Sequence, residues 1–306
     1  MKTGIRRVSL IYNPNAGSLN GDDTSIRLLE SALRAQGIVV DTHATAAADD
    51  ATRLAREATA GNYDALVVCG GDGTINETLQ ELAGTPLPLA VFPCGTANVF
   101  ARDLHLTPDP QKIADMIAAG RVTTFSLGRA SKPDGSWHRL FILMAGIGLD
   151  AAMVKNVRPG LKRQIGIGAY FASAMDYLFR WPLVPFSLSI NGHEYPATFA
   201  AVSNSPSFGG GFIMAPGARM DDDQLNVCMF NSRSRLHYLA YAALALGGKH
   251  TGCKNVTYLA TQSAQAQTYI AASAPADAWV QLDGELVGAL PMQFEIVPHA
   301  LRVITL

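Results

Sequence analysis

Short apolar runs alternate with helical patterns through the first 125 residues of the chain. Strand-like runs occupy residues 8–13, 38–44, 65–69 and 89–93, and helical patterns occupy residues 22–36, 49–60, 74–83 and 96–104. This alternation is typical of βαβ units and predicts a parallel sheet covered by helices. Because the loops that follow parallel strands gather at one edge of such a sheet, a ligand site is expected at that edge.

The pattern changes after about residue 125 to a series of β-like runs. These runs occupy residues 139–149, 185–192, 198–204, 224–230 and 279–288, and helical patterns at 165–181 and 234–248 interrupt them. They predict a β-rich second domain that resembles an antiparallel sandwich or barrel. With 306 residues the chain exceeds the usual size of one domain, so we expect domains at 1–125 and 126–294. Residues 295–306 are a candidate final strand of the first domain.

Charge and hydropathy limit the classes of protein that the chain can belong to. The net charge of −1 and a charged fraction of 16% argue against disorder and against a nucleic-acid partner. No uncharged apolar stretch reaches the roughly 20 residues of a spanning helix, and the apolar run before Asn13 is too short for a signal peptide. We therefore expect a cytoplasmic protein whose contacts with membrane or phosphate are local. The four cysteines are widely scattered, which indicates neither a zinc site nor a disulfide framework.

The buried-looking run at 65–69 ends in the loop Gly70-Gly71-Asp72-Gly73-Thr74. Glycines at a strand-to-helix turn let backbone N–H groups approach an anion, and the start of the helix adds a favourable dipole. The loop is neither GxxxxGK[ST] nor a full GxGxxG, because Asn76 replaces the third glycine. Taken alone it is equally compatible with phosphate binding and with a tight turn capped by Asp72.

Two further loops of similar chemistry favour phosphate binding. NPNAG follows the first strand at 13–17, and PCGTAN follows the fourth at 93–98 and begins a helix. Three polar, glycine-bearing loops would then meet at one edge of one parallel sheet. Such an edge can hold a polyphosphate.

The motifs NPNAG, GGDGTINE and GTANVFAR, in this order and spacing, resemble the catalytic domain of the diacylglycerol kinase superfamily, in particular its soluble bacterial lipid kinases. The resemblance continues through LKRQIGIGAY at 161–170, SNSPSFGGGFIMAPGARMDDDQLNV at 203–227 and LDGE at 282–285, so it covers nearly the whole chain. GGDGT alone also occurs in NAD kinases, but the combination with GTAN, FGGG and DGE is specific.

The resemblance implies an α/β nucleotide-binding domain of the NAD-kinase and diacylglycerol-kinase type, followed by a β-rich sandwich-like domain. It further implies ATP as phosphate donor and Mg²⁺ as cofactor. The residues expected to bind the nucleotide by this resemblance are Asn13, Thr45, Gly70, Gly71, Asp72, Gly73, Thr74, Ile75, Asn76 and Thr96.

Three acids are candidates for the chemistry of phosphoryl transfer, which needs charge neutralisation and a group that accepts the proton of the attacking hydroxyl. Asp72 is placed to influence Mg²⁺ as a ligand or through a water, and in sphingosine kinase relatives the matching acid is also argued to be the base. Asp283-Gly284 between two strand-like runs is a favoured hairpin turn in its own right. The family nevertheless places its proton acceptor in the tripeptide that ends at Glu285. We favour Glu285, with Asp283 next.

A second, structural metal is implied by the resemblance at residues 219–225. Bacterial relatives hold Mg²⁺ there on an aspartate and nearby carbonyls, which points to the side chain of Asp222 and the backbone carbonyls of Arg219 and Gln224, with Mg²⁺ or Ca²⁺ as the ion. Here Asp223 stands where the family usually has glycine. The alternative is a solvated acidic turn.

A lipid acceptor requires an apolar groove near a membrane. FGGGF at 208–212 and the helical pattern at 165–181 are candidates for it, and Lys155, Arg158, Lys162 and Arg163 form a basic cluster suited to an anionic bilayer. The function expected is an ATP-dependent lipid kinase of phospholipid metabolism, peripheral to the membrane, that phosphorylates diacylglycerol or a related lipid. A kinase with a soluble acceptor such as NAD, or a nucleotide-binding regulator that has lost catalysis, are the alternatives. The sequence does not specify the oligomeric state, and a homodimer is one candidate.

Overall fold

The computed structural model describes residues 4–17, 19, 21–156, 178, 183–261, 270–273 and 278–306. The chain forms two compact units. Unit 1 comprises Met1–Leu127 and Pro298–Leu306, and unit 2 comprises Gly128–Val297. Whether the chain folds as independent domains with boundaries at 125/126 and 294/295 stays a prediction.

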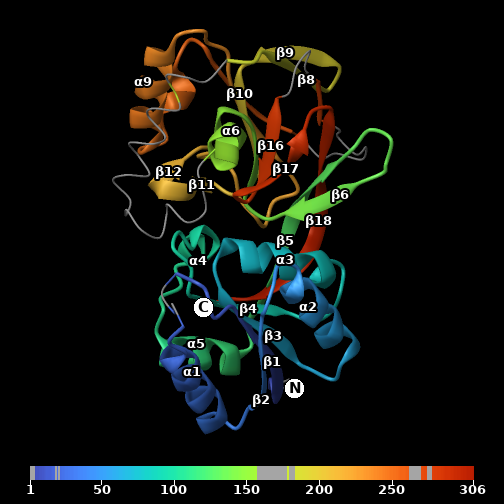
Figure 1. Cartoon of the computed structure of the whole chain (residues 1–306), viewed down its shortest axis with the longest axis vertical. Coiled ribbons are helices and arrows are strands. Elements are labelled where there is room, and N and C mark those ends of the chain that lie inside the picture. Colours follow the sequence, from blue (N-terminus) through green and yellow to red (C-terminus); the bar gives the residue numbers. More distant parts are fainter. Residues whose placement is uncertain are drawn as a thin grey trace. The chain divides into compact units, whose positions relative to one another are not determined.

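Unit 1 alternates strands and helices along the chain (Figure 1). Its elements are β1 (Arg7–Tyr12), α1 (Thr24–Ala35), β2 (Val39–Ala44), α2 (Asp50–Ala60), β3 (Ala65–Gly70), α3 (Asp72–Leu82), β4 (Leu89–Pro93), α4 (Val99–Asp103) and α5 (Pro110–Ala119). Two strands continue from one unit into the other, β5 (Val122–Ser131) and β18 (Met292–Ile304).

The sheet of unit 1 is parallel, with strand order β2-β1-β3-β4-β18. Helix α1 packs with α5 and α2 packs with α3, and Figure 1 shows the two pairs on opposite faces of the sheet. Every residue of β3 and of β4 is buried, as expected for strands covered on both faces. The chain adds β2 on one side of β1 and then β3 on the other side, so the order of the strands reverses between β1 and β3. The carboxyl ends of these two strands lie at the switch point where α/β sheets bind ligands.

Two elements of unit 1 differ from the sequence-based expectation. Helix α5 was not expected, although Asp109 caps it by accepting the N–H groups of Gln111 and Lys112, and Gly120 ends it in the left-handed region. Helix α4 begins at Val99, three residues later than expected. The delay arises because Asn98 has a φ of 46° and its side chain bonds back to the N–H and carbonyl of Gly95.

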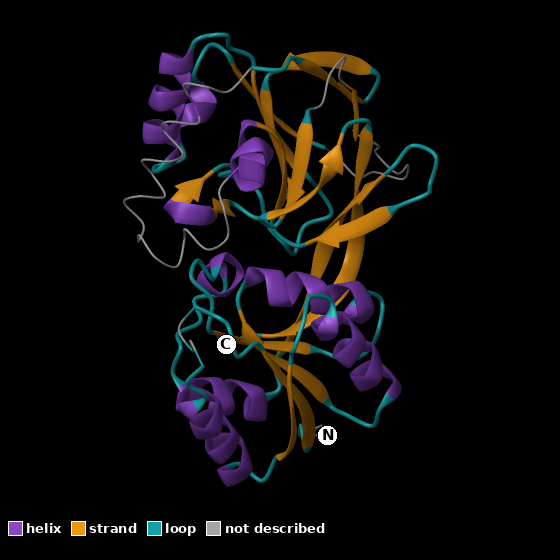
Figure 2. Cartoon of the chain, viewed as in Figure 1, coloured by secondary structure: helices purple, strands orange, loops and turns teal. Residues whose placement is uncertain are grey.

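Unit 2 is built mainly of strands, as Figure 2 shows. Its elements are β6 (His138–Phe141), β7 (Met144–Gly148), α6 (Leu149–Asn156), β8 (Phe186–Ile190), β9 (His193–Ala197), β10 (Phe199–Ser203), β11 (Ser207–Phe208), η1 (Gly209–Gly211), β12 (Phe212–Ile213), β13 (Asn226–Phe230), α9 (Arg235–Ala245), η2 (Lys249–Gly252), β14 (Val256–Ala260), β15 (Ile270–Ser273), β16 (Trp279–Leu282) and β17 (Glu285–Ala289).

Two antiparallel layers enclose the core of unit 2. One is the sheet β14-β13-β10-β7-β16-β17, and the other contains β8, β9, β15 and the first part of β18, with β5 and β6 beside it. Alternate residues of both layers, such as Ile147, Val202 and Leu188, are fully buried in one apolar cluster. The prediction of an α/β domain followed by a β-rich, sandwich-like domain is therefore confirmed.

The run expected as one β segment at 139–149 is interrupted. Strand β6 ends at Phe141 and β7 begins at Met144, because the N–H groups of residues 142–144 turn towards the carboxylate of Asp283 instead of joining a ladder. The helix expected at 234–248 is present as α9. The helix expected at 165–181 lies, apart from residue 178, outside the described residues.

Strand β18 belongs to both units. Its first part pairs antiparallel with β15, and Val303 near its end pairs with Leu89 of β4 in parallel. The sequence left the position of this segment open.

Candidate active site

Two glycine loops of unit 1 touch each other at the carboxyl edge of the parallel sheet. A Cβ atom placed on Gly95, in the loop after β4, would lie 2.4 Å from the Cα atom of Gly71, in the loop after β3. Real side chains do not tolerate so close an approach, so glycine is required at this crossing. The N–H of Cys94 also donates to the carbonyl of Gly70 at 3.0 Å. The loops that begin α3 and α4 thus form one backbone assembly.

The loop after β1 joins the same assembly. A Cβ atom on Gly17 would lie 2.6 Å from Oγ1 of Thr96. Asn13 donates its N–H to the carbonyl of Cys69 at 3.1 Å, and its side-chain oxygen accepts the N–H of Asn15 at 2.9 Å. The structure therefore brings together the three loops that the sequence analysis singled out.

Asp72 connects two of these loops. It is the first residue of α3, and its two carboxylate oxygens accept the N–H groups of Val99 at 3.0 Å and Phe100 at 3.1 Å, at the start of α4. Burial raises the pKa of Asp72 above its ordinary value, and these two hydrogen bonds oppose the rise. Each oxygen keeps a second lone pair, so the carboxylate can still meet a cation as a ligand or through a water.

A pocket of about 240 Å³ lies at the ends of β1 and β2, beside the first turns of α2 and α3. Three of the residues expected to bind nucleotide line it, namely Asn13, Thr45 and Thr74. The other lining residues were not expected: Asn15, Ala46, Ala47, Ala48, Ala51 and Glu77. The small alanines leave the space, and the polar groups around it can direct a ligand. The side chains of Ile75 and Asn76 are buried and do not line the pocket, and the N–H of Ile75 donates to the carbonyl of Gly71 at 3.1 Å.

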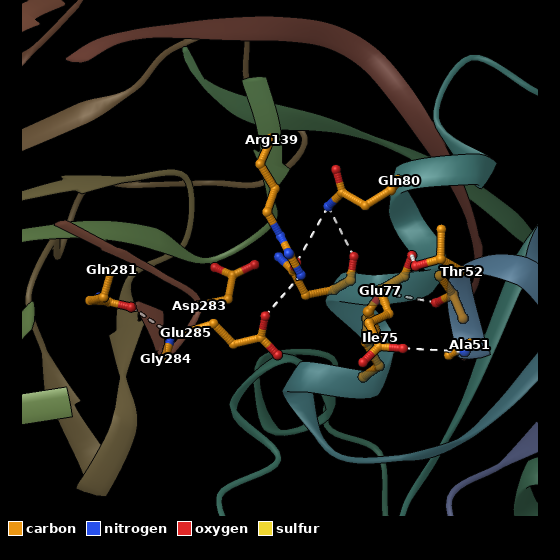
Figure 3. Close-up of polar contacts among 12 residues, drawn as sticks. Ala51, Thr52, Ile75, Glu77, Gln80, Arg139, Gln281, Asp283, Gly284 and Glu285 are labelled. Atoms are coloured by element: carbon orange, nitrogen blue, oxygen red, sulfur yellow. Dashed lines mark hydrogen bonds and ion pairs between the residues drawn. The ribbon is translucent and has the colours of Figure 1, made fainter. Parts of the chain in front are cut away.

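Glu77 is the acid of this pocket and joins α3 to α2. Its Oε2 accepts the N–H of Ala51 at 3.2 Å, and its carbonyl accepts the hydroxyl of Thr52 at 3.0 Å (Figure 3). The spacing offered a signal for it, since Glu77 follows Thr74 by three residues and therefore shares its helix face.

In unit 2, Asp283 and Gly284 form the two-residue turn between β16 and β17. Their φ values of 49° and 93° are the left-handed pair that such turns require. The carboxylate of Asp283 is only 9% exposed. It accepts three backbone N–H groups, from Ile142 at 2.8 Å, Leu143 at 2.9 Å and Met144 at 3.0 Å. Asp283 thus fixes the turn and the interrupted strand to each other.

Glu285, the next acid, is considerably more accessible. Its side chain is 39% exposed, and Oε2 lies 2.8 Å from a guanidinium nitrogen of Arg139 on β6 (Figure 3). Arg139 therefore orients a carboxylate that reaches solvent at the end of the hairpin.

A buried polar chain supports the turn from behind. Gln281, which is fully buried, donates to Oδ2 of Asp150 at 2.6 Å. Its side-chain oxygen accepts the N–H of Gly284 at 2.6 Å (Figure 3). Asn204 also donates to the carbonyl of Ile142 at 2.9 Å. Gly146 leaves the room for this chain, because a Cβ there would lie 2.0 Å from Oδ2 of Asp150. These positioning groups escaped the sequence analysis.

The residues expected to hold a second metal form an exposed turn. Arg219 makes a two-pronged ion pair with Asp221, and its carbonyl accepts the N–H of Asp222 at 3.1 Å. Oδ1 of Asp222 accepts the N–H of Asp223 at 3.2 Å. Within the described ranges no three His, Cys, Asp or Glu side chains gather as a metal site. The expected ligands of Arg219 and Gln224 are backbone carbonyls and not acidic side chains, so the second metal stays a prediction.

The segment expected to meet the acceptor is partly described. The rings of Phe208 and Phe212 lie 6.4 Å apart on either side of η1, and both side chains are half-buried. Of the expected basic cluster, Arg158, Lys162 and Arg163 lie outside the described residues. None of the helices that the structure describes is long and apolar enough to cross a bilayer.

Comparisons with known proteins agree with this architecture. Residues 7–130 match the diacylglycerol kinase catalytic domain, and residues 144–305 match the YegS C-terminal NAD kinase beta sandwich-like domain. A diacylglycerol kinase of Mycobacterium tuberculosis is 31% identical, over 98% of this chain and 95% of the relative, and one of Bacillus subtilis is 29% identical, over 95% and 93%. The fold superposes on a crystal structure of a putative diacylglycerol kinase from Bacillus anthracis with a TM-score of 0.79 at 24% identity, covering 100% of this chain and 97% of the other. The chain therefore belongs to the diacylglycerol kinase family of lipid kinases.

Proposed function

We propose that the protein is an ATP-dependent, magnesium-assisted lipid kinase that transfers the γ-phosphate to a hydroxyl of diacylglycerol or a related lipid. The observation that carries the proposal is the contact between Gly71 and Gly95, which packs two helix-starting loops into one array of backbone donors beside a polar pocket. Because Asp72 takes the N–H groups of Val99 and Phe100 at the start of α4, the donors that suit a polyphosphate are the N–H groups at the start of α3 and the hydroxyl of Thr96 on the adjoining loop.

On the donor side, the N–H groups of residues 71–74 at the start of α3 and the hydroxyl of Thr96 bind phosphate oxygens, whereas the N–H of Ile75 already donates to the carbonyl of Gly71. Asn13, Thr45 and Thr74 hold the rest of the nucleotide in the pocket that they line. When bound, magnesium would neutralise charge on the phosphates, and Asp72 would hold it as a ligand or through a water, with the lone pairs that the two N–H groups leave. A second Mg²⁺ or Ca²⁺ on Asp222 and the carbonyls of Arg219 and Gln224 belongs to the same proposal.

On the acceptor side, Glu285 is the general base. It accepts the proton of the lipid hydroxyl while that oxygen bonds to the γ-phosphorus, and the bond from this phosphorus to the β–γ bridging oxygen breaks to release ADP. Arg139 orients the carboxylate. Asp283 acts through the turn, because three backbone N–H groups occupy its carboxylate. We also propose that the enzyme is cytoplasmic and docks transiently on the membrane that holds its substrate.

The test is transfer of labelled γ-phosphate from ATP with Mg²⁺ to diacylglycerol, phosphatidylglycerol, ceramide or sphingosine in mixed micelles, with NAD as a soluble acceptor. We expect a labelled lipid whose formation falls about 10²- to 10⁴-fold in Glu285→Gln. Glu81→Gln removes the carboxylate of another Arg–Glu pair, with Arg56 in unit 1, and should retain activity. Label on NAD alone would overturn the lipid assignment, and ATP binding without any transfer would favour a regulatory role.

A further inference from the structure

The outer face of α9 is apolar and uncovered. Leu236 is 68% exposed, Leu246 is 56% exposed and Leu244 is 37% exposed. Of the eight large apolar side chains that the described part of the chain exposes, these three lie within α9 and the residue that follows it, whereas the others are scattered. Exposed apolar residues gathered in this way mark an interaction surface.

The opposite face of the same helix holds it to unit 2. Tyr238, Tyr241 and Ala245 are buried. The hydroxyl of Tyr238 bonds to that of Thr198, and the ring of Tyr241 lies 5.2 Å from that of Phe230. The inner face therefore fixes α9, and the fold needs no contact from the outer leucines.

The charged residues that flank α9 along the chain are of one sign. No Asp or Glu occurs between Gln224 and Ala276, while Arg233, Lys249 and Lys254 flank the helix and are exposed. No ion pair involves any of these three side chains within the part of the chain that the structure describes. This combination complements an anionic surface with an apolar interior beneath it.

The apolar face lies next to the segment that we assign to the acceptor. Helix α9 contacts β12, which follows η1, and Figure 1 shows the two on the same side of unit 2. Just beyond the helix, Gly248 packs against Pro216 and Ile213. Phe212 and Ile213 are themselves half-buried, so part of each apolar side chain is exposed on the strand that α9 contacts.

We propose that the outer face of α9 seats in the surface of an anionic bilayer, with Leu236, Leu244 and Leu246 among the acyl chains and Arg233 and Lys249 at the headgroups. Helix α9 has 11 residues and is about 16 Å long, too short to span a bilayer but sufficient to lie in its plane. The inference rests on the proposed function in one respect, since docking here would present the β12 segment to a lipid acceptor.

The test is co-sedimentation of the full chain with vesicles of phosphatidylcholine and phosphatidylglycerol, compared with pure phosphatidylcholine. In the double variant Leu236→Gln, Leu246→Gln we expect binding to fall about tenfold or more. The matched control Leu28→Gln, Leu306→Gln changes leucines that are 56% and 63% exposed, and should bind like the wild type. Arg233→Gln with Lys249→Gln should weaken binding to the anionic vesicles only.

The binding assay requires no turnover, so it separates this inference from the proposed kinase activity. If vesicle binding depends on α9 but no lipid receives phosphate, the docking surface is supported and the proposed lipid substrate is not. Three outcomes would overturn the docking surface: a wild type that does not bind vesicles, equal binding by the α9 and control variants, or a dimer in solution that the α9 variant converts to monomers without loss of vesicle binding.

Discussion

The substitution Asp283→Asn tests whether the carboxylate of Asp283 has a structural role while that of Glu285 has the catalytic one. Asparagine tolerates the left-handed backbone of this turn, so the substitution leaves φ near its value of 49°. It replaces one carboxylate oxygen by an NH₂ group. If Oδ1 keeps Leu143 and Met144, the N–H of Ile142 faces a donor where it had an acceptor at 2.8 Å.

The cost follows from these three bonds. A buried N–H left without an acceptor costs about 1–3 kcal/mol, and each bond that changes from charged to neutral loses on the order of 1 kcal/mol. We therefore expect Asp283→Asn to lower the free energy of unfolding of unit 2 by about 3 kcal/mol. Asp134→Asn is the control, because Asp134 caps an exposed turn by accepting from Ser136, and it should cost less than about 0.5 kcal/mol.

Urea unfolding followed by tryptophan fluorescence measures this effect. All three tryptophans, at positions 137, 181 and 279, belong to unit 2, so the signal reports on that unit. Glu285→Gln should change stability by at most about 1 kcal/mol, since its ion pair is partly exposed, and should lose turnover. If Asp283→Asn keeps the urea midpoint of the wild type and still abolishes transfer, while Glu285→Gln remains active, the assignment of the two acids is reversed.

Three further changes test other parts of the structure. Gly95→Ala should push the two glycine loops apart, weaken ATP binding measured by calorimetry at least about tenfold, and lower the free energy of unfolding by about 1–3 kcal/mol. The control Gly4→Ala, which has nothing near its Cβ, should change neither quantity, and an unchanged ATP affinity in Gly95→Ala would contradict the donor array. Burial lowers the pKa of His250 below its usual 6.5, so as the pH falls the unfolded chain binds a proton at this histidine before the folded chain does. The free energy of unfolding should therefore fall below about pH 6.5, by up to ~1.4 kcal/mol per pH unit. His250→Gln should remove this part of the pH dependence, and parallel curves of stability against pH for the two proteins down to about pH 5 would contradict the reasoning. Gln281→Glu places a second carboxylate against Asp150 and should lower the free energy of unfolding, measured in urea, by about 3 kcal/mol or more. Adding Asp150→Asn should restore much of that stability, and a double variant whose loss equals the sum of the two single losses would argue against contact between the two side chains.

The parts that could be predicted from the sequence depend on local patterns. The apolar run of β3 and the glycines after it identify a buried parallel strand that ends in an anion-binding turn, and the structure has both. Asp283-Gly284 likewise predicts its hairpin turn from two residues. Helix α5 was missed although Asp109 and Gly120 mark its ends, so in that case the signal was present and was overlooked.

The parts that could not be predicted depend on residues distant in the chain. Glycine at position 95 indicates a need for space, but no local pattern says that the backbone of Gly71 fills it. The partners of Asp283 come from residues 142–144, and Gln281 bonds to Asp150, so both acids find their roles only after the strands have paired. The spacing of Glu77 from Thr74 places both on one face of α3, but the contact of Glu77 with Ala51 depends on how α2 packs against α3.

The double membership of β18 has a consequence for synthesis of the chain on the ribosome. Strand β4 is buried along its whole length, and one of its two neighbours is the segment Pro298–Leu306, which is translated after the whole of unit 2. At usual elongation rates of roughly 5–20 residues per second, the edge of β4 therefore remains unpaired for roughly ten to forty seconds before its partner is made. Throughout that interval the nascent protein presents an apolar strand edge of the kind that attracts other chains. Successful expression of this enzyme thus depends on how well that edge is shielded until the segment Pro298–Leu306 has been made.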